Sequence, residues 1–260
     1  FFGPHKRLAS FINIYWLLGT AGLSGQEHVL VVGNKAQERD FIGGILLIAG
    51  QKRVSILTQR MSLGGGFSES ILGPGIERME TRTTVYHGIA RDKIMIFKEE
   101  LASLLALDTS LTLIDGRSER EFWGASVRGL RGGHIVRATH FPPARLRSLT
   151  KSGALIGLEN RDIVIYGHNA FEGLALLTLL HAGFNLKEAR VYPGGWAEWS
   201  ADSNMNINAA TYPDREMRTK PAQMSNFYRP TWTMVLIALA IGMIVIMLYF
   251  FFSRRWSHKQ

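Results

Sequence analysis

Short apolar runs alternate with longer, partly polar segments through most of this chain. The runs that predict strands are residues 29–32, 54–57, 111–114, 163–166 and 190–192. Two longer apolar segments, 41–49 and 174–182, predict helices, and each is followed by a glycine of the kind that ends helices in a left-handed conformation. Short buried strands that alternate with helices predict an α/β fold with a parallel sheet covered on both faces.

Near the C-terminus the pattern changes to one continuous apolar segment. Residues 231–252 contain no charged side chain, and about 20 apolar residues in a helix span a bilayer. Tyr228, Trp232 and Trp256 lie near the ends of the segment, where aromatic rings favour the headgroup layer. We therefore predict a transmembrane helix over 230–252.

Much of the positive charge of the chain lies on the two sides of this segment. The net charge is +9, and residues 204–260 hold seven Lys or Arg against two acidic residues. A basic stripe with interleaved aromatic residues is not seen, so nucleic acid is not expected as a partner. The basic tail at 253–260 favours a cytoplasmic C-terminus. The first residue is Phe1 rather than Met, which is compatible with a removed export signal. We expect a single-pass protein of a bacterial inner membrane, with its soluble modules on the periplasmic side.

Four short motifs follow one another in the middle of the chain. They are a D-x-R-x-x-x-E pattern, a Gly-Gly-His turn, an apolar strand that runs into a glycine, and a Gly-Gly-Trp. Their residues are Asp115, Arg117, Glu121, His134, Gly167, Gly194, Gly195 and Trp196. In this order and spacing, residues 95–202 resemble a rhodanese (sulfurtransferase) domain. The resemblance implies a parallel sheet flanked by helices, with the active-site loop directly after the strand at 163–166.

The resemblance also implies that the residue after this strand should be the cysteine that carries the persulfide. Gly167 stands there, and the whole chain has no cysteine. Thiol catalysis, disulfides and thiolate metal sites are thereby excluded within the chain. We expect no enzyme activity, no cofactor and no metal site, because zinc-binding patterns are absent as well.

The degenerate active-site loop is expected to keep the anion-favouring backbone of an active loop. It consists of Gly167, His168, Asn169, Ala170, Phe171 and Glu172. The loop is expected to precede a helix N-terminus, where backbone N–H groups favour anions, but the carboxylate of Glu172 would repel thiosulfate. His168 has no nucleophile or carboxylate partner at a known motif spacing, so we interpret it as structural or solvated. The Asp115, Arg117 and Glu121 side chains are expected to fix the end of their strand to neighbouring backbone.

A second, incomplete copy of the same pattern precedes the first. Residues 28–34 are similar to 162–168, and residues 53–57 to 189–192. Residues 1–80 therefore resemble the back part of a first rhodanese module, without the front part. Its degenerate loop holds Gly33, Asn34 and Lys35, and either Gly33 or Asn34 occupies the cysteine position. The predicted fold is one complete and one partial rhodanese-like module plus one transmembrane helix.

These predictions divide the chain into six parts. They are a partial module at 1–80, a linker at 81–94, a second module at 95–202, a linker at 203–229, the span at 230–252 and the tail at 253–260. A module without its nucleophile, held at a bilayer, indicates an accessory or scaffold subunit of an integral membrane protein complex. Two alternatives remain, which are a sulfur-relay component that relies on a partner's thiol and an anion-sensing module that uses the empty loop.

Overall fold

A computed structural model describes residues 1–3, 7–58, 84–107, 110–150 and 161–209. In this part of the chain no helix is long and apolar enough to cross a membrane. The span predicted at 230–252 and the basic tail at 253–260 lie outside the described residues, as does most of the linker predicted at 203–229.

The N-terminal segment has a helix–strand–helix–strand order. Its elements are α1 (Phe11–Thr20), β1 (His28–Val31), α2 (Ala36–Ile48) and β2 (Arg53–Ile56). The two strands pair in parallel, with Val31 opposite Ile56. The helix predicted at 41–49 begins five residues earlier, at Ala36. The apolar pattern did not predict these residues, because most of them are polar.

The rest of the described chain builds a larger sheet. Its elements are η3 (Asp92–Ile94), α3 (Lys98–Leu107), β3 (Thr112–Asp115), α4 (Glu119–Phe122), β4 (His134–Ile135), β5 (Thr139–His140), α5 (Pro143–Thr150), β6 (Ile163–Tyr166), α6 (Ala170–Thr178), η4 (Leu179–Gly183), β7 (Arg190–Val191), α7 (Gly195–Ala201) and β8 (Ile207–Asn208). Four strands form a parallel sheet in the order β5-β3-β6-β7, which confirms the predicted α/β class with helices around a parallel sheet.

Both faces of this sheet are buried. Ile163 and Ile165 of β6 point into a core shared with α2, α5 and α6, whereas Val164 and Tyr166 pack with Leu101 of α3 and with α7. Because all four residues of β6 are buried, the strand reads as a continuous apolar run, as expected for the centre of a parallel sheet.

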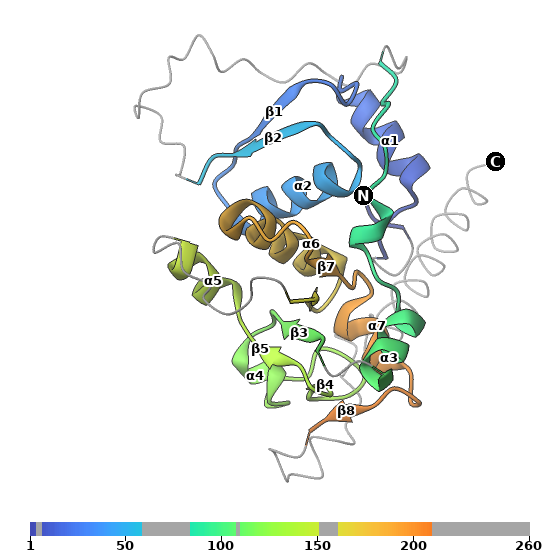
Figure 1. The fold of residues 1–260 in the computed structure, drawn as a ribbon, viewed down its shortest axis with the longest axis vertical. Helices are drawn as coiled ribbons and strands as arrows, with labels where there is room; N and C mark the ends of the chain where they lie inside the picture. The colour runs from blue at the N-terminus through green and yellow to red at the C-terminus, as the bar shows by residue number, and fades with distance from the viewer. Residues whose placement is uncertain (4–6, 59–83, 108–109, 151–160, 210–260) are drawn as a thin grey trace, which may run out of the picture. The chain divides into compact units, whose positions relative to one another are not determined.

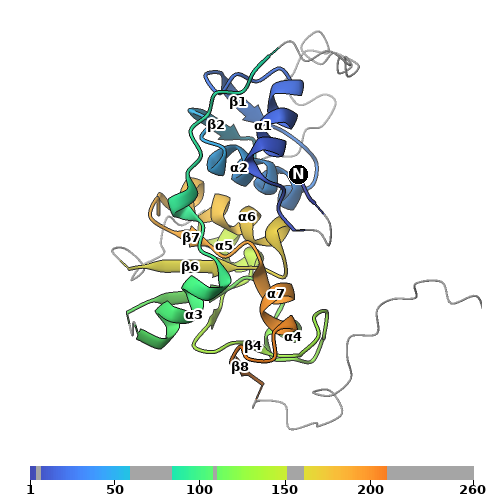
Figure 2. The ribbon, with the colours of Figure 1, turned by 90° about the vertical axis from the view of Figure 1, so that its right-hand side faces the viewer.

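Helices α2 and α6 lie against each other between the two parallel sheets (Figures 1 and 2). Glycine permits the close approach: a Cβ on Gly44 would lie 2.5 Å from the Leu174 carbonyl oxygen. At the other end of the crossing, the Thr178 hydroxyl donates to the Asp40 carbonyl oxygen at 2.7 Å. Arg147 on α5 adds an ion pair with the Asp40 carboxylate.

The outer face of the β1–β2 sheet is open in the part of the chain that the structure describes. Leu30 is 52% exposed, and Val32 just after the strand is 44% exposed. Val29 and Val31 face the core instead. The corresponding face of β6 is covered by α3 and α7, and the N-terminal segment shows no counterpart of these helices among the described residues.

The structure differs from the predicted linkers. Strand β8 lies inside the range 203–229 and pairs antiparallel with β4, so that the Gly-His-Ile turn is part of a small second sheet. Within the range 81–94, Tyr86 is buried against Tyr15 and η3 forms a turn. Neither segment has the apolar periodicity of a long element, and their contacts are with distant parts of the chain.

Candidate functional site

The loop after β6 is held by hydrogen bonds at both ends. Asn169 caps α6, since its side chain accepts a hydrogen bond from Glu172 N at 3.3 Å. The backbone of α7 closes the loop from outside, because Trp196 N donates to Gly167 O at 3.0 Å and Ala197 N donates to His168 O at 2.9 Å. The predicted Gly-Gly-Trp motif therefore supports the loop directly.

Gly167 has no room for a side chain. A Cβ there would lie 2.4 Å from Cβ of Glu172 and 2.9 Å from Gly173 N, far inside ordinary van der Waals contact. The first turn of α6 occupies the space in which a nucleophile would begin. The site thus lacks both the thiol and the volume that a thiol would need.

The carboxylate of Glu172 occupies the anion-favouring position of the loop. Its Oε2 accepts a hydrogen bond from His168 N at 2.7 Å, and its Oε1 lies 2.8 Å from the Arg128 guanidinium. Arg128 also bonds Glu121 at 3.1 Å. The N–H group and the nearest cation are thus both engaged by a side chain of the protein itself.

The surroundings of His168 favour its neutral form. Burial lowers the pKa of His168, and the positive charge of Arg128 lowers it further. Its Nδ1 is buried and has no hydrogen-bond partner in the described part of the chain.

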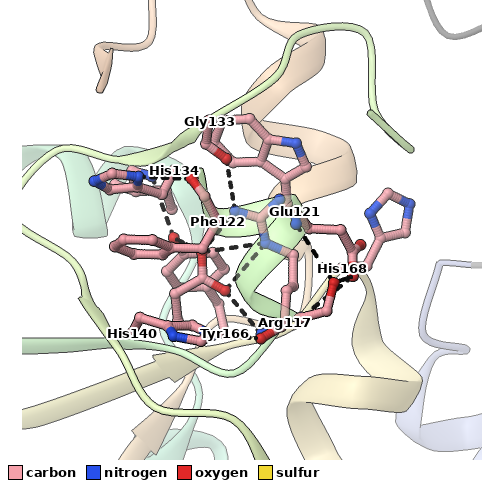
Figure 3. Close-up of polar contacts among 12 residues, drawn as sticks. Arg117, Glu121, Phe122, Gly133, His134, His140, Tyr166 and His168 are labelled. Carbon is pink, nitrogen blue, oxygen red and sulfur yellow. Dashed lines mark hydrogen bonds and ion pairs between the residues drawn. The ribbon is translucent and has the colours of Figure 1, made fainter. Parts of the chain in front are cut away.

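A buried polar network lies beneath the loop (Figure 3). Asp115 and Arg117 form an ion pair at 2.6 Å in which both side chains are almost fully buried. Arg117 also donates to Gly133 O at 2.7 Å, and the Tyr166 hydroxyl donates to Asp115 at 2.5 Å. The guanidinium carbon lies 4.4 Å from the ring centre of Trp196. Residues that are widely separated in the sequence thus meet around one arginine.

The remaining motif residues orient backbone. His134 donates from Nδ1 to Phe122 O at 2.9 Å and stacks on the Phe122 ring, and burial lowers its pKa. Glu121 forms a capping box with Ser118 at the start of α4. Burial would raise the pKa of Glu121, but the Ser118 hydrogen bonds and the charge of Arg128 lower it.

The loop after β1 shares one inter-strand hydrogen bond with the loop after β6, but its helix has no side-chain cap at Lys35. Leu57 N donates to Val31 O at 3.0 Å, as Tyr192 N donates to Ile165 O at 2.9 Å. Gly33 follows Val31 by two residues, just as Gly167 follows Ile165. The structure therefore places Gly33, not Asn34, at the position equivalent to Gly167.

The side chains of this first loop differ from those of the second. Arg39 is buried and donates to the carbonyl oxygens of Gly33 and Thr58. Lys35 is exposed and pairs with Glu38 at 2.9 Å. The Asn34 side chain forms no hydrogen bond within the described residues. The two loops therefore follow equivalent strands, but their side chains form different contacts.

A cavity of about 390 Å³ lies beside the second loop, between α5, α6 and the end of β3. Its charged lining has both signs, and these charges are paired: Arg128 with Glu121 and Glu172, and Arg147 with Asp40. Arg128 was missed by the sequence analysis, since nothing marks it as a partner of a carboxylate 44 positions away. In the described residues no three His, Asp or Glu side chains are placed to hold a metal ion.

One protein-family model matches the middle of the chain. Residues 97–202 match the model of the rhodanese-like domain. The chain therefore contains a rhodanese-like domain. This range begins two residues after the predicted start of the second module and ends at the predicted residue.

Solved structures extend the likeness of fold beyond the rhodanese-like domain. A probable thiosulfate sulfurtransferase has a TM-score of 0.54 at 21% identity, over 77% of this chain and 84% of that one. YnjE has a TM-score of 0.57 at 19% sequence identity, and the match covers 79% of this chain and 54% of YnjE. Wild-type EanB has a TM-score of 0.59 at 17% sequence identity, and the match covers 78% of this chain and 55% of EanB. The chain thus spans little more than half of YnjE and EanB. Among curated proteins the search found no match. At these identities the likeness shows the fold alone.

Proposed function

We propose that this chain is a catalytically inactive, membrane-anchored rhodanese-like protein that acts as an accessory or scaffold subunit of a membrane protein complex. The observation that carries the proposal is the closed loop after β6. A Cβ at Gly167 would meet Glu172 at 2.4 Å, and the sequence contains no cysteine. A rhodanese-like fold that keeps its sheet and helices without a catalytic cysteine retains a rigid surface for binding.

We further propose a tandem arrangement, with the N-terminal segment as a partial first module. Its support is the equivalent inter-strand hydrogen bond at the two loops and the α2–α6 contact. Asp40 O meets Thr178 on one side of the crossing, and Leu174 O meets Gly44 on the other. When Gly33 is aligned with Gly167, Asp40 corresponds to Leu174 and Gly44 to Thr178. The two contacts are therefore related by a local twofold axis.

The anchor is proposed on the sequence of residues 231–252, and the open face of β1–β2 gives the scaffold a place to bind. Leu30 and Val32 are apolar and exposed there. An exposed apolar sheet face next to an unpaired strand edge is a surface that a partner covers in many assemblies. The expected partners are integral membrane proteins in the same bilayer, and the proposed location is a bacterial inner membrane with the modules on the periplasmic side.

Two measurements test the proposal. The purified chain, given thiosulfate and cyanide, should form no thiocyanate above background, and turnover would refute the loss of activity. Membranes solubilised in mild detergent should release the chain as a stoichiometric complex with integral membrane proteins in size exclusion and mass spectrometry. A monodisperse monomer from native membranes at low salt would refute the scaffold role.

The anchor has its own test. Alkaline carbonate should leave the full chain in the membrane pellet, whereas a truncated form that ends at Met217 should be released. A full chain washed off by carbonate would refute the anchor. The sulfur-relay alternative predicts that thiocyanate appears when a copurifying thiol protein is added back.

A further inference from the structure

A separate cavity of about 310 Å³ lies at the other end of the α2–α6 crossing. Leu47 of α2, Val54 and Ile56 of β2, and Ile94 of η3 give it apolar walls. It shares no lining residue with the cavity beside Glu172. Its volume falls at the lower end of the range of small-molecule sites.

The rim of this cavity is cationic. Lys52, Arg91 and Lys187 line it, all three are exposed, and no carboxylate side chain contributes to the lining. None of the three forms an ion pair with an acidic side chain within the described ranges. The cavity beside Glu172 is different, because its arginines are already paired. Three unpaired cations around one opening favour an anionic occupant.

The wall of the cavity holds an unused hydrogen-bond acceptor. Gln51 is 2% exposed, and its Nε2 donates to Glu27 O at 2.7 Å. Its Oε1 is buried and has no partner in the described part of the chain. A buried acceptor without a donor costs free energy, so an occupant that supplies an N–H or O–H would be favoured.

The π turn after α6 forms the remaining side. In η4 the helix widens to π geometry, and His181 and Ala182 of this turn line the cavity. The equivalent end of α2 stays a regular α-helix to Ile48, and Gly50 beyond it has φ +80°. Single π turns are found frequently at functional sites, and here the turn breaks the local twofold symmetry at the cavity.

We propose that this cavity binds a small organic anion with an apolar body and a hydrogen-bond donor. The anionic group pairs with the rim cations, the body lies against the apolar walls, and the Gln51 side chain turns to bring its buried Oε1 to the donor. The proposal is independent of the scaffold role, since it uses none of the residues of the degenerate loop.

The test uses four compounds that each carry part of this chemistry. Isothermal titration calorimetry of the full chain in detergent, corrected for protein-free micelles, compares 4-hydroxybenzoate with benzoate, phenol and inorganic sulfate. We expect 4-hydroxybenzoate to bind most tightly. Benzoate lacks the donor and phenol lacks the charge, so each should bind about tenfold more weakly or worse. Sulfate lacks the apolar body and should bind weakest.

Two variants and one control locate the binding. The triple variant Lys52→Gln/Arg91→Gln/Lys187→Gln removes the rim charge and should weaken 4-hydroxybenzoate binding by at least about tenfold. Ala182→Phe fills the cavity without changing a charge and should abolish binding. The matched control removes three exposed cations that do not line the cavity, by Arg53→Gln, Lys93→Gln and Arg120→Gln.

The outcomes decide the proposal. Binding that is lost in both cavity variants and kept in the control supports it, provided that melting temperatures remain unchanged. An unchanged affinity in the triple variant or in Ala182→Phe overturns it. So does an absence of 4-hydroxybenzoate binding at millimolar concentration, or an equal affinity for all four compounds.

Discussion

Restoring a cysteine at Gly167 should destabilise the protein rather than revive a sulfurtransferase. The new Cβ would lie 2.4 Å from Cβ of Glu172 and 3.0 Å from its carbonyl carbon. Ordinary contact begins near 3.4 Å, so the first turn of α6 must move by about 1 Å, and overpacking of this kind costs about 1–3 kcal/mol. For a folded unit of this size, that corresponds to a melting temperature about 2–12 °C lower.

The assay is thermal unfolding followed by circular dichroism, together with thiocyanate formation from thiosulfate and cyanide. Gly3→Cys is the matched control, because a Cβ at Gly3 meets nothing within 4 Å and the same thiol is added. We expect Gly167→Cys to melt lower than Gly3→Cys and to show no turnover. Glu172→Gly removes the nearest clashing atom and should recover part of the loss in the Gly167→Cys background. A Gly167→Cys variant with the wild-type melting temperature would refute the steric reasoning.

Three further predictions concern stability. Arg117→Met should cost about 3–5 kcal/mol in urea unfolding, because it leaves the fully buried Asp115 carboxylate without its ion pair, and a loss below about 1 kcal/mol would contradict the network. Gly44→Ala should lower the unfolding free energy by more than the control Gly3→Ala, because its Cβ would lie 2.5 Å from a carbonyl oxygen of α6; equal values would contradict the close crossing. The pKa values of buried His134 and of half-buried His168 and His181 are lowered, so below their ordinary value of 6.5 the unfolded state binds more protons. Stability should therefore fall as pH drops from 6.5 towards 5, and a flat urea midpoint over this range would contradict it.

The local sequence predicted three of the four strands of the parallel sheet β5-β3-β6-β7, and the loop after β6. Strands β3, β6 and β7 are short apolar runs, and burial on both faces leaves such runs without polar interruptions. The motif order indicated a rhodanese-like domain, and the family model matches residues 97–202. Asp115 contacts Arg117, and the Gly-Gly-Trp motif supports the loop after β6. The absence of a nucleophile was also visible, since it requires only the identity of Gly167.

The sequence alone did not settle the register of the first loop. Gly33 and Asn34 are equally good matches in the sequence, and the choice depends on hydrogen bonds between strands that are far apart in the chain. The start of α2 was missed because its first turn is polar and helix formation there depends on packing against α6. Residues 207–208 looked like part of a linker because two residues carry no periodicity, and only pairing with β4 makes them a strand.

The chemistry of the loop itself was decided by tertiary structure. The sequence showed that Glu172 is acidic and would oppose an anion, but not that its carboxylate binds His168 N and Arg128. Arg128 comes from a distant loop, and no local pattern relates the two. The cationic cavity at Lys52, Arg91 and Lys187 also could not be predicted from a local pattern, because its residues come from three separate parts of the chain. Residue identity determines which reactions are impossible, whereas the positions of charges around a cavity depend on contacts that form only when the whole unit folds.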